Sequence, residues 1–377
     1  MTDGALAVVG LGSVGSMALW QASQRSGDVV GFEASTPAHP RSAVGGDTRL
    51  FRMTYRGEGN YYPILQAAQR LWRQLEAESG ADILTQCGGL SIGEVDGEYL
   101  PALMDSIKRT GAAFEVLDHG EMGRRYPQHE LARDECGIFD PEAGFLRTDR
   151  AVLAAVGAAQ ARGASVVSGT RIHAVEEGPD CVVVRSDSGT WNFDRVIVTA
   201  GSWSRELLPA GLRKRVQPHR IYLTWFPARN PAEFAPEVFP IFIRINKRGS
   251  LYGPPSVDGA TVKATLDGRG QPAESPETID RALTSAEIEE SHATVADFLP
   301  GLVPSIVRSD AYPDLYTVDH DPILGFSPES QRVYVATGFS GAGFKMSSAY
   351  GAIAAREALG DDPQITGLDF VRPTRFV

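Results

Sequence analysis

Two glycine-rich segments carry the chemistry that this sequence first suggests. One is Gly10-Leu11-Gly12-Ser13-Val14-Gly15, and the other is Gly338-Phe339-Ser340-Gly341-Ala342-Gly343-Phe344-Lys345. The first can present backbone N–H groups to a pyrophosphate, and the second can hold a lysine close to a bound ligand. Either turn alone is a weak signal, so the interpretation depends on finding both in one chain.

The residues around the first segment predict a dinucleotide-binding unit. The run Ala5 to Val9 predicts a buried strand, Ser13 to about Arg25 a helix, and Val29 to Phe32 a second strand. In such a unit Gly10 permits the tight turn, and Gly12 lets the backbone approach the pyrophosphate. Gly15 lets the helix pack closely on the strand.

Glu33 stands at the end of the second predicted strand. A carboxylate there accepts hydrogen bonds from ribose hydroxyls and repels a 2′-phosphate, which makes NADP an unfavourable ligand. A glycine-rich turn without a ligand is the alternative, but the turn, the strands and the acid all favour a nucleotide. This unit alone does not separate FAD from NAD.

Composition bounds the class of protein. With 377 residues, the chain exceeds what one hydrophobic core usually serves, so we expect two domains. The net charge of -11 argues against nucleic acid or an anionic membrane as a partner. Three cysteines without metal-like spacing predict no metal site and a reducing compartment. The apolar segment Ala5 to Trp20 is too short and glycine-rich for a membrane span or signal peptide, so we expect a cytoplasmic protein.

Strand-like runs recur along the chain and predict an α/β fold with two interleaved domains. The runs 164–175, 181–184, 195–201 and 332–338 belong with the N-terminal unit, and 241–245 alternates as in a mixed or antiparallel sheet. We therefore predict a Rossmann-like FAD-binding domain of residues 1–81, 150–215 and 309–377. A mixed or antiparallel-sheet substrate domain takes residues 82–149 and 216–308, and 268–277 is the expected exposed loop.

Six segments spread over nearly the whole chain point to one family. They are Gly10 to Glu33, Gly46-Asp47-Thr48-Arg49-Leu50-Phe51-Arg52, Thr199-Ala200-Gly201-Ser202-Trp203, Leu315-Tyr316-Thr317, Gly338 to Ser348 and Arg372-Pro373-Thr374-Arg375-Phe376. In these segments the chain resembles the monomeric sarcosine oxidase family, with N-methyltryptophan oxidase and related FAD-dependent amine oxidases of the D-amino acid oxidase-like superfamily.

The resemblance implies roles for individual residues. Arg52 and Lys345 would hold the substrate carboxylate, Tyr316 would point a hydroxyl into the same pocket, and Lys263 would lie near the flavin and promote its reaction with oxygen. The residues expected to contact FAD are Gly10, Gly12, Ser13, Val14, Gly15, Glu33, Ala34, Arg41, Thr48, Arg49, Val175, Ala200, Gly201, Trp203, Gly338, Gly341, Gly343, Phe344 and Lys345.

Physical chemistry supports these roles, and each has a simpler alternative. A guanidinium grips a carboxylate through two parallel hydrogen bonds, and an ammonium adds charge from another side. A fixed cation favours the negative charge that develops on oxygen. The alternatives are a structural ion pair for Arg52, a surface lysine for Lys345, an ordinary lysine for Lys263 and a core tyrosine for Tyr316.

The chain departs from the family at two positions. Many relatives attach FAD through a cysteine two residues before the tyrosine, where this chain has Asp314, so we predict FAD without a covalent link. Attachment through His39 is the alternative. Asp267 replaces a family histidine beside the substrate. An anion there disfavours a second carboxylate and favours an amine or hydroxyl, unless Asp267 is a loop residue turned to solvent.

We therefore expect an oxidase that converts a carboxylate-bearing secondary amine or N-substituted amino acid to an imine and hydrogen peroxide. Its partners would be that small molecule and molecular oxygen, and we expect a monomer. The alternatives are a flavin dehydrogenase with another electron acceptor, a glycine oxidase-like deaminating oxidase, a nicotinamide dehydrogenase and a nucleotide-binding module without catalysis.

Overall fold

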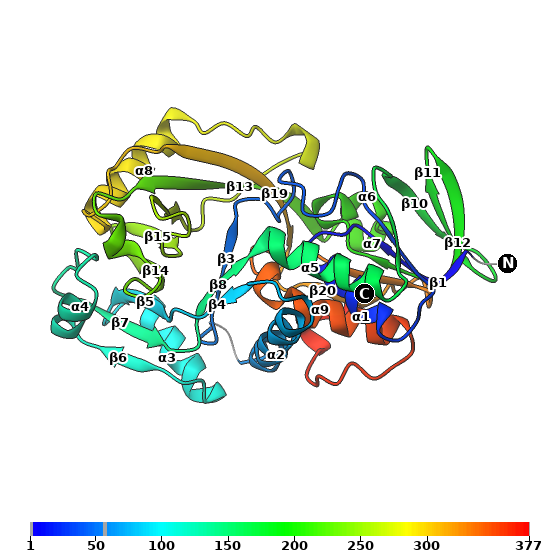
Figure 1. The fold of residues 1–377 in the computed structure, drawn as a ribbon, viewed down its shortest axis with the longest axis horizontal. Coiled ribbons are helices and arrows are strands. Elements are labelled where there is room, and N and C mark those ends of the chain that lie inside the picture. The colour runs from blue at the N-terminus through cyan, green and yellow to red at the C-terminus, as the bar shows by residue number, and fades with distance from the viewer. Residues whose placement is uncertain (1–2, 56–58, 377) are drawn as a thin grey trace.

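The structure is a computed structural model that describes residues 3–55 and 59–376. The described strands form four sheets, of which two are large. Figure 1 shows the eight-stranded sheet on the right and the six-stranded sheet on the left, with two long strands running between them. This arrangement divides the molecule into two halves.

The eight-stranded sheet is built around a parallel centre. Its strands are β1 (Gly4–Val9), β2 (Val29–Phe32), β9 (Ser165–Val167), β10 (Ile172–Glu177), β11 (Val182–Ser186), β12 (Gly189–Val198), β20 (Ile323–Phe326) and β21 (Val333–Thr337). β1 pairs in parallel with β2 and β12, and β12 pairs in parallel with β21. Burial on both faces explains the unbroken apolar run of β1. The first half of β12 forms an antiparallel meander with β10 and β11.

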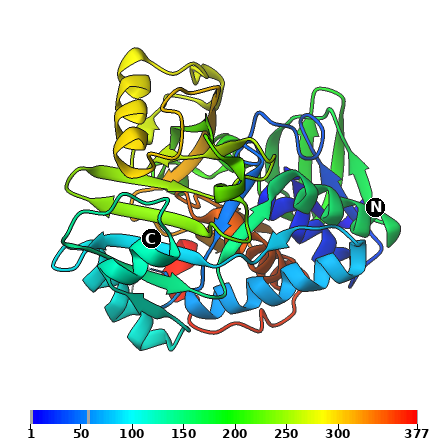
Figure 2. The ribbon, with the colours of Figure 1, turned by 60° about the vertical axis from the view of Figure 1, so that its left-hand side comes forward.

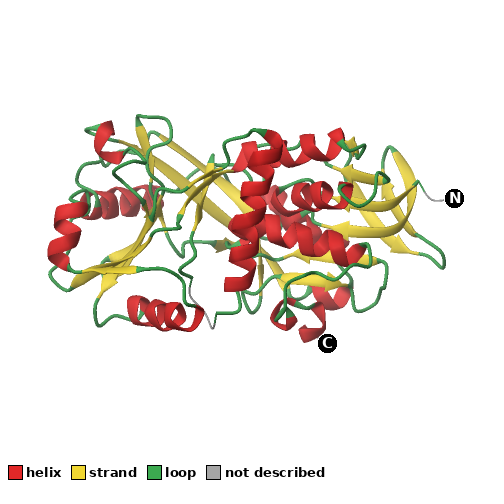
Figure 3. Ribbon diagram, turned by 60° about the horizontal axis from the view of Figure 1, so that its bottom comes forward, coloured by secondary structure: helices red, strands yellow, loops and turns green. Residues whose placement is uncertain are grey.

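Helices gather in this half of the molecule (Figure 3). They include α1 (Ser13–Ser23), α2 (Tyr62–Ser79), α5 (Thr148–Ala161) and α9 (Gly343–Ala358). α1 is buried from Val14 to Ser23 because it lies between neighbouring helices and the sheet. Gly351 of α9 allows a close helix crossing, since a Cβ there would lie 2.5 Å from Met17 Cβ. α2 buries one face against α9 and runs along the lower front of Figure 2.

The six-stranded sheet is mixed. In order across the sheet its strands are β17 (Thr265–Leu266), β15 (Gly249–Gly253), β14 (Ile241–Asn246), β5 (Gly89–Glu94), β7 (Glu135–Asp140) and β6 (Glu115–Leu117). Only β14 and β5 pair in parallel. The helices α3 (Tyr99–Thr110), α4 (His119–Arg125) and α8 (Ser285–Phe298) belong to this half.

Two long strands connect the halves. β13 (Val216–Pro227) and β19 (Arg308–Thr317) pair antiparallel from Val216↔Thr317 to Trp225↔Arg308 (Figure 1). Short strands complete the sheets: β16 (Thr261–Lys263) and β18 (Gln271–Pro272) join β13, and β3 (Thr48–Phe51), β8 (Gly144–Arg147) and β4 (Leu84–Thr85) form the smallest sheet. Two short helices, α6 (Ser204–Leu207) and α7 (Ala210–Arg213), precede β13.

The predicted α/β fold with a Rossmann-like unit and a mixed sheet is confirmed. The first helix ends at Ser23 rather than near Arg25, and the segment predicted as a loop, 268–277, includes β18 and the start of a turn of helix at Pro276–Thr278. β13 lies in the predicted substrate domain and most of β19 in the predicted FAD-binding domain, yet the two strands pair along their length. The predicted domain boundaries therefore stay a prediction. Within the described ranges, no helix is long and apolar enough to span a bilayer, and no group of side chains could hold a metal ion.

Candidate active site

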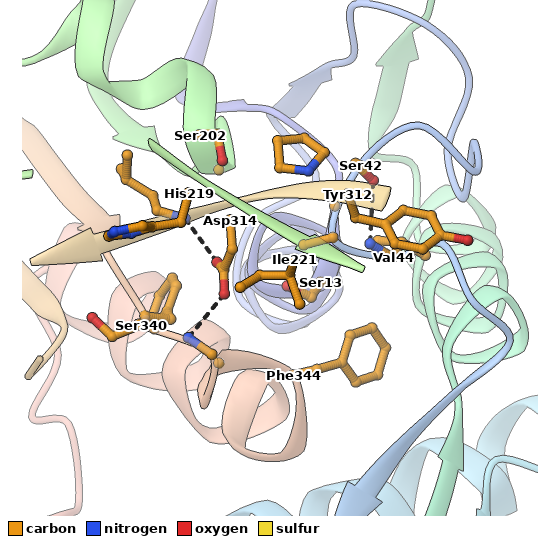
Figure 4. Close-up of a pocket in the computed structure, with 18 of the residues that line it drawn as sticks. Ser13, Ser42, Val44, Ser202, His219, Ile221, Tyr312, Asp314, Ser340 and Phe344 are labelled. Atoms are coloured by element: carbon orange, nitrogen blue, oxygen red, sulfur yellow. Dashed lines mark hydrogen bonds between the residues drawn. The ribbon is translucent and has the colours of Figure 1, made fainter. Parts of the chain in front are cut away.

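A cavity of about 930 Å³ lies where the two halves meet. One end is lined by the N-terminal glycine turn, residues 32–35 and the segments that follow β12 and β21. The other end is lined by residues of β13, β14 and β15 and by 266–270. Figure 4 shows side chains from both ends converging on this space.

The glycine turn has no room for a side chain at its first and last glycines. Gly10 has a φ of +92°, and a Cβ there would lie 2.7 Å from Ala200 Cα. A Cβ on Gly15 would lie 1.8 Å from the Gly10 carbonyl oxygen. Gly12 and Ser13, at the start of α1, line the cavity, and no side chain caps this helix N-terminus. Unpaired N–H groups at a helix N-terminus form an anion-binding site.

Glu33 is fixed beside this turn. Its carboxylate accepts hydrogen bonds from Leu11 N at 3.0 Å and Ser35 N at 2.9 Å. His39 Nε2 lies 3.6 Å from the same carboxylate, and burial lowers the pKa of His39 despite the attraction of Glu33. Glu33 lines the cavity with 7% of its surface exposed. A carboxylate with remaining acceptor capacity in this position suits ribose hydroxyls.

Two cations, the half-buried Arg49 and the buried Lys263, hold the loop that precedes β3. Arg49 donates hydrogen bonds to the carbonyl oxygens of Ala43, Gly45 and Thr48 at 2.7 to 2.8 Å. Lys263 Nζ donates to the carbonyl oxygens of Gly46 at 2.9 Å and Thr48 at 2.6 Å. Burial lowers the pKa of Arg49, and burial and then the Arg49 charge lower the pKa of Lys263 well below 10.5.

Asp314 ties β19 to the second glycine-rich segment. Its carboxylate accepts hydrogen bonds from Gly341 N and from Leu315 N, each at 2.8 Å, and it lies in the cavity wall (Figure 4). Burial raises the pKa of this carboxyl group. Phe344 follows the glycines and stacks on Trp72 with ring centroids 6.1 Å apart. The start of α9 is therefore positioned by the connecting strand β19 and by the helix α2.

Arg52 and Lys345 converge on the ring of Tyr55. Arg52 Cζ lies 5.5 Å and Lys345 Nζ 4.6 Å from the ring centroid, and all three residues line the cavity. Arg52 Nη1 also contacts the Tyr99 hydroxyl at 3.5 Å. Within residues 3–55 and 59–376, no carboxylate forms an ion pair with Arg52. The structural ion pair considered as its alternative role is therefore absent from this part of the chain.

Most of the predicted site residues are brought together in one cavity wall. Those that line it are Gly10, Gly12, Ser13, Val14, Glu33, Ala34, Arg41, Arg49, Arg52, Ala200, Gly201, Trp203, Asp267, Tyr316, Gly338, Gly341, Gly343, Phe344 and Lys345. Among them Trp203 Nε1 donates a hydrogen bond to Glu277 at 2.6 Å, and the Tyr316 ring meets the His219 ring edge-on at 4.2 Å.

Four predicted residues lie outside this wall. Gly15 packs behind the turn, and Thr48 and Lys263 lie behind the loop that Lys263 holds. Val175 packs in β10 against the core of the eight-stranded sheet. The residues of this region that line the cavity are Thr170, Arg171 and Ile172, the last of which begins β10.

Several cavity residues carried no prediction, among them His219, Ile221 and Leu223 of β13 and Tyr312 of β19. Alternation along β13 could have grouped its three residues on one face of the strand. It would not have found Tyr222, Pro313 and Leu315, which line the cavity between them. Burial, followed by the charge of His320, lowers the pKa of His219, so its ring is neutral near neutral pH. Tyr55 and Tyr99 carried no sequence signal of their own.

The residues present fit FAD. The glycine turn offers backbone N–H groups to a pyrophosphate, and Glu33 offers a carboxylate to a ribose. The same cavity is also lined by Asp314 and Tyr316 and by the cations Arg52 and Lys345. Its volume lies at the upper end of the usual range for ligand sites, as a large cofactor with a substrate beside it requires.

Comparison with known proteins agrees with this geometry. Residues 5–357 match the family described as FAD dependent oxidoreductase. The chain is 31% identical over 358 residues to monomeric sarcosine oxidase of Bacillus sp. (strain B-0618), covering 93% of this chain and 91% of the relative. It is 32% identical over 353 residues to N-methyl-L-tryptophan oxidase of Yersinia pestis (strain Pestoides F), covering 93% of each.

Solved structures share the fold at lower identity. NikD, an unusual amino acid oxidase essential for nikkomycin biosynthesis, aligns with a TM-score of 0.87 at 20% identity over 99% of this chain and 98% of that one. Glycine oxidase from Geobacillus kaustophilus aligns with a TM-score of 0.82 at 20% identity over the whole of both chains. These structures support the fold alone.

Proposed function

Because this chain belongs to the family of FAD-dependent oxidoreductases and is an enzyme of the sarcosine oxidase-like group, we propose that it oxidises a carboxylate-bearing secondary amine or N-substituted amino acid. The products would be an imine, which water then hydrolyses, and hydrogen peroxide. The observation that carries the proposal is the meeting of Arg52 and Lys345 at the Tyr55 ring inside the cavity.

The two cations would bind the substrate carboxylate. The guanidinium of Arg52 offers paired donors, and the Lys345 ammonium offers a second charge from α9. Fixing the carboxylate orients the neighbouring carbon, so that the reacting bond meets the cofactor in one geometry. The cations also favour the neutral form of the substrate amine, because like charges disfavour protonation. A neutral amine is required, since an ammonium has no lone pair to assist oxidation.

FAD would be held by the turn at Gly10 to Val14, by Glu33 and by the segment from Gly338 to Phe344. When bound, it supplies the electron acceptor of the reaction. We propose that it binds without a covalent link, because Asp314 occupies the attachment position and Cys87, Cys136 and Cys181 do not line the described cavity. His39 lines it, but its Nδ1 accepts a hydrogen bond from Arg41 N at 3.3 Å.

Acid precipitation tests this part of the proposal. We expect purified protein to show a flavin absorption spectrum and to release FAD into the supernatant. Yellow colour that stays with the precipitate would overturn the non-covalent assignment but leave the amine oxidation intact.

Oxygen is the proposed electron acceptor, with Lys263 as the residue that promotes its reaction. Support comes from its buried ammonium, which has no carboxylate partner among the described residues and lies next to the loop of the cavity wall. A charge held in a dry site stabilises an anion more strongly than the same charge in water. A dehydrogenase with another acceptor and a glycine oxidase-like deaminating oxidase are the competing functions.

Substrate screening separates these functions. N-alkyl amino acids, cyclic imino acids and ordinary amino acids would be tested for loss of flavin colour without air and for peroxide release with air. We expect colour loss and peroxide with the first two groups. Colour loss with little peroxide would indicate a dehydrogenase, and activity confined to primary amino acids would favour the glycine oxidase-like reaction.

A further inference from the structure

The substrate end of the cavity has an acidic pole as well as a cationic one. Arg52 lies at the side of β5, because it contacts Tyr99, whose hydroxyl donates a hydrogen bond to Ser91 Oγ at 3.1 Å. Asp267 lines the same cavity directly after β17, at the opposite edge of this part of the sheet. A ligand held by its carboxylate at Arg52 therefore extends toward Asp267 if it follows the sheet.

The floor between the two poles is apolar. The register places Ser91 of β5 beside Ile243, Ile243 beside Tyr252, and Tyr252 beside Thr265 of β17. Three spacings of about 4.8 Å separate the outer strands, or about 14 Å before the two charged side chains reach inward. The cavity lining along this path consists of Ile243, Ile245, Tyr252 and Leu266. Such a floor suits a chain of methylene groups.

The backbone of Asp267 is fixed, whereas its carboxylate is available. Asp267 N donates a hydrogen bond to the Ser250 carbonyl oxygen at 3.3 Å, and Ser250 Oγ donates one to the Asp267 carbonyl oxygen at 2.9 Å. Among the residues that the structure describes, none forms a hydrogen bond or ion pair with the carboxylate itself. Arg269, the cation closest in sequence, pairs with Glu290 of α8 instead.

We propose that the enzyme selects substrates whose side chain ends in a cationic nitrogen, an ammonium or a guanidinium, bound at Asp267. This inference rests on the proposed function, because the carboxylate of the same substrate must lie at Arg52 and Lys345. The α-nitrogen carries the oxidised bond, the methylene chain crosses the apolar floor, and the terminal charge meets the acid. Asp267 acts as a specificity-determining residue and takes no part in the oxidation.

Binding of unreactive ligands to the FAD-loaded enzyme tests the proposal without turnover. ε-Aminocaproate carries a carboxylate and a terminal ammonium at the separation found in lysine, caproate lacks the ammonium, and adipate replaces it with a second carboxylate. None of them has an α-nitrogen to be oxidised. We expect ε-aminocaproate to bind about tenfold more tightly than caproate, and adipate to bind most weakly, because Asp267 is exposed and contributes one charged contact. Calorimetry or the shift of the flavin spectrum measures each Kd.

Variants locate the effect. In Asp267→Asn the preference for ε-aminocaproate over caproate should vanish while caproate binding stays unchanged. Glu290→Gln is the matched control, because it removes a negative charge nearby without removing a cavity carboxylate, and it should keep the preference. Equal Kd values for the two ligands in the wild-type protein, or a preference that survives Asp267→Asn, would overturn the inference.

The variant Arg52→Ala tests the proposed function separately from the role of Asp267. If Arg52 binds the substrate carboxylate, this variant weakens binding of caproate and ε-aminocaproate alike, and unchanged binding of both would contradict the proposed function. Turnover then follows binding: Nα-methyl-lysine should exceed Nα-methyl-norleucine in kcat/KM by about tenfold in wild type and match it in Asp267→Asn. Equal turnover of the two by the wild-type enzyme refutes the role of Asp267 but leaves the amine oxidase intact.

Discussion

Two buried cations, Arg244 in the six-stranded sheet and Lys263 in the four-stranded sheet that contains β13, differ in whether a carboxylate neutralises their charge. Arg244 of β14 has no exposed surface and lies against Glu135 of β7, with contacts of 2.9 Å from Nε and 2.5 Å from Nη2. Lys263 of β16 is 5% exposed. Within the described chain its Nζ donates to the carbonyl oxygens of Gly46 and Thr48 and lies 5.9 Å from the centroid of the Trp225 ring, and no carboxylate pairs with it. One charge is neutralised and the other is not.

The neighbours of each cation reinforce this contrast. Burial acts to raise the pKa of Glu135, but hydrogen bonds from Arg244 and others lower it overall, so the pair is ionised. Arg244 also donates to two backbone carbonyl oxygens and lies 4.0 Å above the Phe298 ring. Around Lys263 the charges of Arg49 and Arg308 add repulsion, and only Asp47 offsets it.

The contrast between Arg244 and Lys263 suggests how a buried charge that stabilises the fold can be distinguished from one that serves the reaction. A buried charge with full compensation stabilises a particular packing, and its removal leaves a partner unsatisfied. A buried charge without compensation costs stability, so its presence points to a task in the site. We expect Arg244 to serve the fold and Lys263 to serve the chemistry.

The largest effect should come from Arg244. Arg244→Met leaves the Glu135 carboxylate buried without its partner, so we expect the free energy of unfolding to fall by about 3–5 kcal/mol. Urea unfolding followed by circular dichroism measures this. Replacing both partners, Arg244→Met with Glu135→Leu, should recover most of the loss. A single variant as stable as the wild-type protein would remove the structural side of the comparison.

Lys263→Met should instead leave the fold stable and slow one step of catalysis, the reaction of the reduced enzyme with oxygen. We expect the reaction of the reduced enzyme with oxygen to slow about a hundredfold or more, with a much smaller change in anaerobic reduction by the amine. Unfolding should shift by no more than about 1–2 kcal/mol, because two lost hydrogen bonds are offset by the removal of an uncompensated charge. Stopped-flow mixing resolves the two steps. An unchanged oxygen rate would make Lys263 a support for its loop and nothing more.

Arg52 and Lys345 line the cavity, and we expect their replacement to lower catalytic efficiency without a large change in stability or in the reaction with oxygen. Arg52→Ala and Lys345→Met are each expected to lower kcat/KM for a carboxylate-bearing amine by about a hundredfold, since a charge-assisted contact contributes a few kcal/mol. Unfolding curves should change little. An amine without a carboxylate is the control substrate, because its turnover should be almost insensitive to both changes. Wild-type efficiency in both variants would show that the clamp has been misplaced.

The smallest effect is a pH dependence carried by Lys263 alone. Burial holds its pKa below 10.5 in the folded state, so folding expels a proton between the lowered value and the unfolded value. In that window the free energy of unfolding rises with pH, by at most about 1.4 kcal/mol per pH unit. The oxygen rate falls as pH rises through the lowered pKa, because the ammonium loses its charge. Both trends should disappear in Lys263→Met, and their persistence there would assign them to another group.

The parts of the molecule that sequence could predict are local. The run from Gly10 to Glu33 fixes a strand, a turn, a helix and an acid within one short stretch, and the structure reproduces each of them. The segment Ile241–Asn246 shows the limit of such reasoning. Its alternation predicts a strand but not which face is buried. Phe242 and the charged Arg244 are buried, whereas Ile243 and Ile245 line the cavity.

Positions fixed by distant pairings were beyond the same reasoning. Val175 pairs with Val184 of β11 and does not line the cavity, and its expected contact with FAD stays a prediction. Lys263 reaches the loop at Gly46 through the pairing of β16 with β13. Asp314 could be identified as a substituted position, but its contact with Gly341 depends on how β19 meets the second glycine segment. These placements come from tertiary structure.

The strand order of the eight-stranded sheet has a consequence for folding. β1 pairs with β12, and β12 with β21, so the sheet is completed only by residues near the end of the chain. Long-range pairings of this kind form slowly, because closing the long intervening loop costs conformational entropy before the pairing offsets it. During synthesis the emerging chain would therefore expose its central strand until the last segment leaves the ribosome. We expect FAD capture to be a late event, closely followed by completion of the sheet.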